Sequence, residues 1–343
     1  MSISLGSTNF GSLYLGSTKI VEAYLGSAKV YGPAQPDPFN PLGLPPYTMR
    51  FQFADSNYNP STDSSDSGHW KTGSTWTNVS SSPNVWDYTY QKNDWSYAFS
   101  NIPTWQYPYG TNVSVLGANT RSVNNMTSLF SYTKLMAIEP FSLSGITSMS
   151  YMFAHCDLRN TALPLFNTST ITDMSYVFEY AVFGNYSQFP NGYTIPNWDV
   201  SHVITMTGIF KDTKASNSQA GVVIPSTWST SIALLRIPYA FKNAYVWNAQ
   251  NLYTNNVEEF QYAFAECYFM DNGNYLPAIN TDGARNVERM FSGNSYCNGN
   301  ILNMYNQLAA NQNIFNHSKC FYNCGSSTTD GQAELAQIPS DWK

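Results

Sequence analysis

The side chains most able to do chemistry in this chain are its 5 cysteines and 4 histidines, and their placement favours structure over catalysis. Cys156, Cys267 and Cys324 share one recurring position, three residues after a phenylalanine. Because no Cys-x-x-Cys pair occurs, we expect buried structural thiols and no metal site. The histidines are scattered, and no nucleophile, phosphate-loop or dinucleotide motif accompanies them. We therefore expect a protein that is not an enzyme and that needs no cofactor.

A polar loop over residues 55–68 carries the spacing Asp55-x-Asn57-x-Asn59, which is that of the start of a calcium loop. The glycine and the bidentate glutamate that complete such a loop are missing from the following residues. A solvated loop is therefore the simpler interpretation, with calcium binding as the alternative.

Tryptophans gather in the region 47–115, which opens with an alternating strand pattern at residues 47–53. They are Trp70, Trp76, Trp86, Trp95 and Trp105. The end of a stack of repeats exposes an apolar edge and needs an atypical cap. We predict that residues 47–115 form a β- and aromatic-rich N-terminal cap sealed by these rings. An aromatic platform for sugars is the alternative.

Between residues 116 and 324 a short pattern of apolar residues recurs eight times. Typically an aliphatic residue is followed three positions later by a second apolar residue, and four positions after that by phenylalanine. The phenylalanines are Phe130, Phe153, Phe178, Phe210, Phe241, Phe264, Phe291 and Phe321. Such spacing places side chains on one helical face, and good N-cap residues often precede it. Each copy is predicted to be a short strand, a turn and a short helix, with the phenylalanines in a shared core.

Two copies carry the strings Ser144-Gly-Ile-Thr-Ser-Met-Ser-Tyr-Met-Phe-Ala-His-Cys156 and Thr168-Ser-Thr-Ile-Thr-Asp-Met-Ser-Tyr-Val-Phe178. They resemble the BspA-type leucine-rich repeat and its relative in mycoplasma surface proteins, Asp-Thr-Ser-x-Val-Thr-x-Met-Ser-x-Met-Phe-x-x-Cys. The resemblance implies a mixed α/β repeat solenoid, leucine-rich-repeat-like, over residues 116–324. Residues 325–343 are expected to close it as a C-terminal cap, with a short helix near Ala333. A fold of this kind does not by itself define a function.

Residues 1–32 hold a second repeat, of period ten, in which Leu5, Leu15 and Leu25 each begin a Leu-Gly-Ser triplet. Gly-Ser between alternating segments predicts hairpin turns and a small β-meander. A meander this short buries little surface alone, so we expect it to anchor the chain to a partner. The triplets resemble leader segments of tail-associated and head-fibre proteins of gut bacteriophages. The six prolines of residues 33–46 predict a stiff linker.

The composition is poor in charge, at 11%, and rich in aromatic residues, at 16%. A net charge of −6 argues against nucleic acid, whose phosphates need a basic patch. Tyrosine-rich polar surfaces suit contacts with glycans or proteins. No apolar run reaches the length of a membrane span, and the N-terminus lacks the basic start and apolar core of a signal peptide.

We therefore expect a bacteriophage virion structural protein, assembled in the host cytoplasm and anchored to capsid or tail proteins through residues 1–32. As a head fibre, or a tail-associated fibre, it would project its repeats to bind host-surface or environmental glycans or proteins. Fibres attach with symmetry, so a homo-oligomer is expected, with a trimer favoured. The alternatives are a bacterial cell-surface adhesin exported by a non-Sec route and a virion-borne glycan depolymerase.

Overall fold

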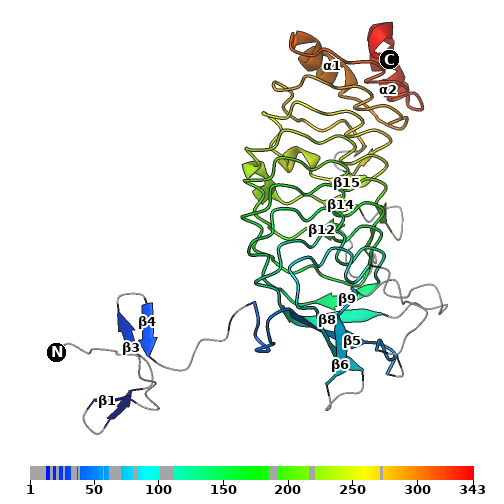
Figure 1. Ribbon diagram of the computed structural model, residues 1–343. Coiled ribbons are helices and arrows are strands. Elements are labelled where there is room, and N and C mark those ends of the chain that lie inside the picture. The colour runs from blue at the N-terminus through cyan, green and yellow to red at the C-terminus, as the bar shows by residue number, and fades with distance from the viewer. Residues whose placement is uncertain are drawn as a thin grey trace.

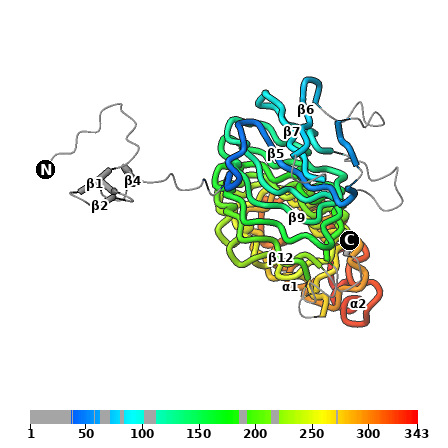
Figure 2. The backbone as a smooth tube through the Cα atoms, turned by 90° about the horizontal axis from the view of Figure 1, so that it is seen from below, coloured from blue at the N-terminus to red at the C-terminus, as the bar shows by residue number. Residues whose placement is uncertain are grey.

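The repeated segments fold into coils that lie on one another, so that the chain builds a column (Figure 1). Viewed along this column, the coils superpose (Figure 2). The structure, a computed structural model, describes residues 13–15, 18–20, 23–25, 28–31, 37, 39–56, 58–61, 71–79, 84–100, 112–184, 192–215, 221–270 and 273–343.

A five-stranded sheet lies at the N-terminal end of the column, in the order β6-β7-β5-β8-β9. Its strands are β5 (Thr48–Phe53), β6 (Thr75–Asn78), β7 (Val85–Thr89), β8 (Val113–Asn119) and β9 (Leu135–Ile138). All neighbours are antiparallel except β8 and β9, which run parallel. Lys134, just before β9, pairs in parallel with Asp157 of the next coil. The sheet therefore passes directly into the stacked coils.

Short parallel strands continue along the column in two ladders, β10-β11-β13 and β12-β14-β15-β16. Their bounds are β10 (Asp157–Leu158), β11 (Val182–Phe183), β12 (Tyr193–Thr194), β13 (Lys214–Ala215), β14 (Val222–Val223), β15 (Tyr245–Trp247) and β16 (Tyr268–Phe269). Parallel pairing of coil on coil follows from a chain that always winds in the same direction.

The predicted mixed α/β solenoid, with a helix in every coil, is wrong. The α-helices of the described chain are α1 (Ile301–Ala310) and α2 (Thr329–Ala336), both at the C-terminal end. The remaining helical pieces are the 3-10 turns η2 (Ser226–Thr230), η3 (Ala249–Asn251) and η5 (Ser340–Trp342). Where a helix was expected, the coils form parallel β-bridges and tight turns. The short strands of the coils follow the repeat phenylalanine instead of preceding it.

Two local preferences keep the repeat segment out of a helix. Five residues before the phenylalanine stands a short polar side chain in most coils, and in the third predicted copy Asp173 Oδ1 accepts the backbone N–H of Ser175 at 2.8 Å. Such side chains draw the backbone into turns instead of helices. Two positions per coil also have positive φ, which a right-handed helix cannot contain. The backbone groups pair between coils instead, as from Phe153 N to Val177 O at 3.0 Å.

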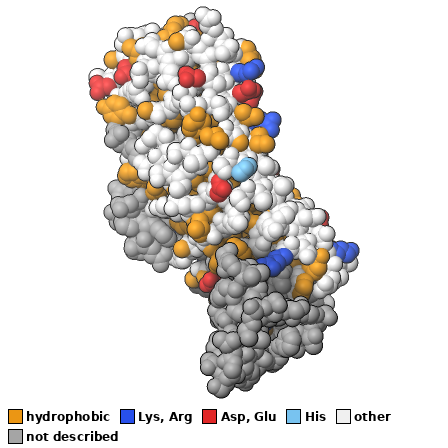
Figure 3. All heavy atoms as spheres, turned by 90° about the vertical axis from the view of Figure 1, so that its left-hand side faces the viewer, with side chains coloured by type: hydrophobic (Ala, Val, Ile, Leu, Met, Phe, Trp, Pro, Cys, Tyr) orange, Lys and Arg blue, Asp and Glu red, His pale blue; other side chains and the backbone are white. Residues whose placement is uncertain are grey.

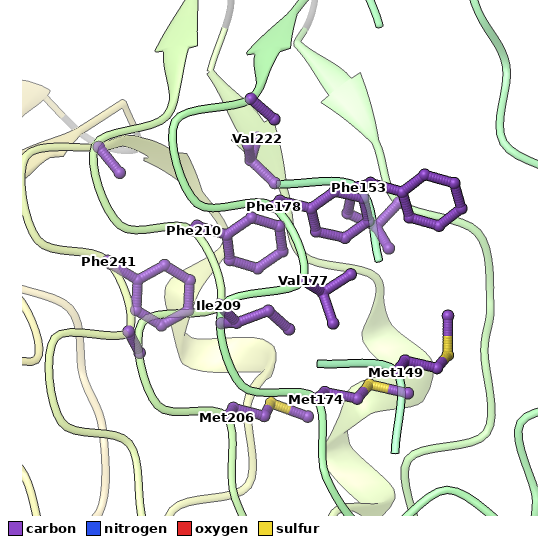
Figure 4. Close-up of a cluster of buried hydrophobic side chains, with 14 of the residues drawn as sticks. Met149, Phe153, Met174, Val177, Phe178, Met206, Ile209, Phe210, Val222 and Phe241 are labelled. Atoms are coloured by element: carbon purple, nitrogen blue, oxygen red, sulfur yellow. The ribbon is translucent and has the colours of Figure 1, made fainter. Parts of the chain in front are cut away.

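The core of the column is a continuous stack of phenylalanine rings, all eight of which are fully buried. Neighbouring rings lie 5.2 to 5.8 Å apart and nearly parallel. Figure 4 shows this row beside a second row formed by Met149, Met174 and Met206. Phe99 extends the stack by one coil that the sequence pattern missed, 5.8 Å from Phe130. The apolar residues spaced three and then four positions apart therefore pack into a shared core, but they do not lie on a helix.

The recurring cysteine position has a structural task in the core. Cys156 Sγ donates to the carbonyl oxygen of Phe130 in the preceding coil at 2.8 Å. Thr133 Oγ1 and Asn294 Nδ2 occupy the same position in their coils and bond the equivalent carbonyls of Phe99 and Phe264. All 5 cysteines are free and buried, and burial raises the pKa of the Cys156 thiol to about 12. The cysteines are therefore core residues, and at the recurring position Cys156 also supplies a hydrogen bond to the neighbouring coil.

Both ends of the chain have their own elements. The N-terminal strands are β1 (Leu13–Leu15), β2 (Thr18–Ile20), β3 (Ala23–Leu25) and β4 (Ala28–Tyr31). Leu15 pairs with Thr18 and Leu25 with Ala28, so the strands flanking each Gly-Ser pair are antiparallel. They form two separate two-stranded sheets rather than one continuous meander over the described residues. Leu5 lies outside those residues. At the other end, α2 includes the predicted helix near Ala333.

Candidate binding surface

Two rows of side chains run up the column at the positions of positive φ. The first outer row lies two residues before the core phenylalanine and comprises Tyr97, Ser128, Tyr151, Tyr176, Gly208, Tyr239, Tyr262, Arg289 and Lys319. The second outer row lies two residues after it and comprises Tyr132, His155, Tyr180, Asp212, Asn243, Glu266, Gly293 and Asn323. Tyrosine is the commonest residue in the first row, although its bulk makes a positive φ costly.

Stacked rings offset part of this strain. In the first outer row, the rings of Tyr151 and Tyr176 are 4.8 Å apart, and those of Tyr239 and Tyr262 are 4.9 Å apart. In the second outer row, His155 lies between Tyr132 and Tyr180, at 4.1 and 4.8 Å. Aromatic pairs of this kind contribute about 0.5–1.5 kcal/mol each. Because stacked faces cover one another, the ring edges and phenol groups supply the accessible surface.

Three tyrosines of the two rows are markedly exposed. Tyr97 is 57% exposed, Tyr132 46% and Tyr180 39%. Among the described residues Tyr97 has no ring partner, since Ser128 follows it in the row. Among the described residues, its positive φ is therefore not offset by ring stacking.

Gly208 separates the two stacks of the first outer row. A Cβ atom there would collide with the ring of Tyr176, which covers the glycine backbone. The glycine thus seats the tyrosine of the preceding coil, and the aromatic stack resumes at Tyr239.

A closed network of charges lies beside the second outer row. Lys211 Nζ contacts Glu179 Oε1 at 2.6 Å and Asp212 Oδ2 at 3.4 Å, and it lies 5.2 Å from the ring centroid of Tyr180. Burial acts to raise the pKa of Asp212, but hydrogen bonds from Asn243 and Tyr180 and the charge of Lys211 lower it below its usual value. One ammonium group is thus shared by two carboxylates and lies near an aromatic ring, all within the chain, so the network suits structure better than proton transfer. Figure 3 shows few, scattered charged side chains on the face that it presents.

The histidines occupy three different environments. Burial between two tyrosine rings lowers the pKa of His155, although the Glu179 carboxylate acts to raise it. His317 is half-buried and stacks on Trp342 at 4.2 Å, and so closes the end of the column as a structural residue. His202 is exposed, and His69 lies outside the described residues. The described part of the chain contains no group of three or more His, Cys, Asp or Glu side chains able to hold a metal ion.

The residues of the possible calcium loop are only partly described by the structure. Asn59 Oδ1 accepts hydrogen bonds from the N–H and the hydroxyl of Ser61, at 3.0 and 2.6 Å, so it serves a local turn. Asn57 is not among the described residues, and the calcium interpretation stays untested.

The described tryptophans of the N-terminal region pack inward. Trp95 is fully buried against Phe99 and Tyr88, and Trp86 is 8% exposed. Trp76 packs on Phe51 at 5.5 Å. Trp86 and Trp95 lie in the interior and Trp76 is half-buried against it, while Trp70 and Trp105 fall outside the described ranges. Trp95 also takes the methionine position of the coil of Phe99, which is why the pattern was missed.

Parallel coils with an internal phenylalanine stack define a repeat protein in which each coil needs its neighbours. The family described as "Mycoplasma protein of unknown function, DUF285" matches residues 93–220, 180–275 and 236–332, which together span more than half of the chain. The chain belongs to this family, and the resemblance to the mycoplasma-type repeat is confirmed. The first match begins at residue 93, where the coil of Phe99 begins. Comparisons with curated proteins and with solved structures gave no match. In the described part of the chain, every helix is too short or too polar to cross a bilayer.

Proposed function

We propose that the protein is a non-enzymatic bacteriophage virion component, a head fibre or tail-associated fibre, whose coils present a binding face for surface glycans or proteins. The observation that carries the binding part is the first outer row, where tyrosine occupies left-handed positions. Glycine and asparagine fit such positions at lower cost, and the chain uses them at Gly208 and Asn243. A fold that accepts either residue does not itself require tyrosine.

Tyrosine is suited to contact because it offers a large rigid surface with a polar tip and loses little side-chain entropy on binding. The rows repeat with every coil, so a ligand that is itself extended or repetitive meets the same group several times. Several weak contacts then add up through effective concentration.

The attachment part of the proposal concerns residues 1–32. Within the described residues, the short strands β1 to β4 pair as two separate hairpins, and isolated two-stranded hairpins are marginal in water. A partner surface, or copies of the same segment in a homo-oligomer such as a trimer, would supply the burial they need. The virion location therefore rests on this anchor and on the sequence resemblance of its triplets.

The test of location is immunogold electron microscopy of purified virions, with serum raised against residues 116–324. Gold on capsid or tail supports the proposal and separates a head fibre from a tail fibre. Unlabelled virions with gold on the bacterial surface would instead establish the exported adhesin. A chain lacking residues 1–32 should fold and yet fail to join the virion.

The test of the binding face is adhesion of the purified protein to host cells. Tyr97→Gly and Tyr132→Gly keep the positive φ accessible while removing exposed rings, so we expect adhesion about tenfold weaker from protein that circular dichroism shows to be still folded. Tyr296→Ala, which removes a 56% exposed ring outside both rows, is the matched control. Unchanged adhesion in the row variants would reject this face. Cleavage of a host polysaccharide by the wild-type protein would favour the depolymerase instead.

A further inference from the structure

A cavity of about 670 Å³ lies where the regular coils meet the C-terminal helices. That volume is within the range of small-molecule sites. Apolar surface comes from Phe269 of β16 and from the segment Tyr275–Ala278. Polar groups come from Gln250 of η3, from Asn300 and Asn303 at the start of α1, and from Glu334 of α2. The lining thus combines two aromatic rings with amides and a single carboxylate.

The carboxylate of Glu334 is held in place by the start of α1. Its Oε2 accepts the backbone N–H groups of Ile301 and Leu302 at 2.7 and 2.9 Å. These are among the N–H groups that a helix start leaves without a partner, and the positive end of the helix dipole offsets the negative charge. The second oxygen, Oε1, is left as an acceptor beside the cavity.

Gly299 lies against two side chains of the cavity lining, Tyr275 and Glu334. Its φ is not in the left-handed region, so its backbone would tolerate another residue. A Cβ atom there would lie 2.9 Å from Cε1 of Tyr275 and 3.1 Å from Oε1 of Glu334. The glycine therefore leaves the space that the tyrosine ring and the carboxylate occupy beside the cavity.

We infer that this cavity binds a neutral saccharide. The ring of Tyr275 is 43% exposed and offers a flat apolar surface for the C–H face of a sugar. The amides of Gln250 and Asn303 both donate and accept hydrogen bonds, and Glu334 accepts, which matches the mixed donors and acceptors of vicinal hydroxyl groups.

Charge and polarity argue against the other ligand classes. The lining contains no Lys, Arg or His, so an anionic ligand would lie beside Glu334 with nothing to balance its charge. A purely apolar ligand would leave the amides and the carboxylate desolvated without partners. A cationic ligand would find a carboxylate whose charge the helix start already offsets.

This site is separate from the outer rows that carry the proposed function, because none of its lining residues belongs to either row. The two ideas can therefore fail independently. Loss of the outer-row tyrosines leaves saccharide binding in the cavity unchanged, and loss of the cavity ring leaves the outer rows intact.

The experiment titrates the full-length protein with cellobiose, maltose, lactose and N,N′-diacetylchitobiose, using calorimetry and saturation-transfer NMR. Glucose 6-phosphate is the anionic comparison. We expect at least one neutral disaccharide to bind at millimolar concentration or below, with signal transfer to its ring protons, and glucose 6-phosphate to bind more weakly. No binding by any neutral probe, or tighter binding of glucose 6-phosphate, would overturn the assignment.

Two variants locate the binding. Tyr275→Ala removes the ring face and should weaken binding at least tenfold. Gly299→Ala adds only a methyl group that displaces the ring and the carboxylate, and should weaken binding without removing any polar group. Tyr322→Ala, which removes a 44% exposed ring outside the cavity, is the matched control. Circular dichroism melting checks that each variant is folded. Affinity retained by folded Tyr275→Ala would place the sugar elsewhere and reject this site.

Discussion

The inner and outer aromatic rows of the same coils obey different rules. The inner row is phenylalanine in all nine coils, with rings buried from solvent. The first outer row keeps φ between 52° and 58° at every position, while its residue varies from glycine through tyrosine to arginine. The backbone path is therefore constant and the outer side chain is free to differ. Packing dictates the inner row, whereas the outer row is available for contacts with other molecules.

Removing an inner ring should have the largest effect on stability. Phe178 stacks on Phe153 and Phe210 and is fully buried, so Phe178→Ala should lower the free energy of unfolding by about 3–5 kcal/mol. Because each coil depends on its neighbours, several coils should unfold together. Urea denaturation followed by circular dichroism measures both effects.

The matched outer change is Tyr97→Gly, which removes an exposed ring and relieves a positive φ. Because glycine avoids the cost of a left-handed backbone, about 1–2 kcal/mol, the variant should not lower the free energy of unfolding and should raise it by up to that amount. A cost below about 1 kcal/mol for Phe178→Ala, or equal costs for the two variants, would remove the distinction between the rows.

Gly208 tests how the outer row is coupled from coil to coil. Gly208→Ala places a methyl group against the ring of Tyr176 at a residue with positive φ. We expect it to cost about 1–2 kcal/mol for the left-handed backbone, and more for the displaced ring. In the Tyr176→Ala background the cost of displacing the ring should disappear. The two substitutions should therefore show a coupling energy of about 0.5–1.5 kcal/mol. Additive costs, within about 0.3 kcal/mol, would show that the ring moves aside freely.

The sequence predicted the register of the column but not its local conformation. The positions of eight core phenylalanines were visible because burial fixes residue type. The prediction of a helix in each coil was wrong because two structures produce the same apolar spacing of three and four residues. One is a helix, and the other is a series of four-residue turns whose inward side chains face the core. Side chains such as Asp173 and the tyrosine at 176 held the discriminating information, since one favours a turn and the other occupies the left-handed position.

The candidate sites were harder to find because their chemistry depends on contacts between distant residues. Gln250, Tyr275 and Glu334 meet only when the coils are stacked and α2 folds back on α1. Nothing in their local sequence marks them. The coil of Phe99, which the sequence pattern missed, could have been found from its local sequence. Asp94 and Tyr97 match the polar and tyrosine positions of later copies.

The smallest expected effect comes from the histidine of the second outer row. Burial lowers the pKa of His155 below its ordinary value of about 6.5, so the folded protein binds this proton less readily than the unfolded chain. The stability that His155 contributes is therefore complete above about pH 6.5 and declines as the pH falls below it. His155→Tyr, which matches its neighbours Tyr132 and Tyr180, should lose less stability than the wild type between about pH 7.5 and about pH 5.5. Urea midpoints at the two pH values give the comparison, and the other histidines cancel because both proteins contain them. Equal losses would mean that the imidazolium is accommodated between the rings, and that the outer row tolerates charge as readily as it tolerates a change of residue type.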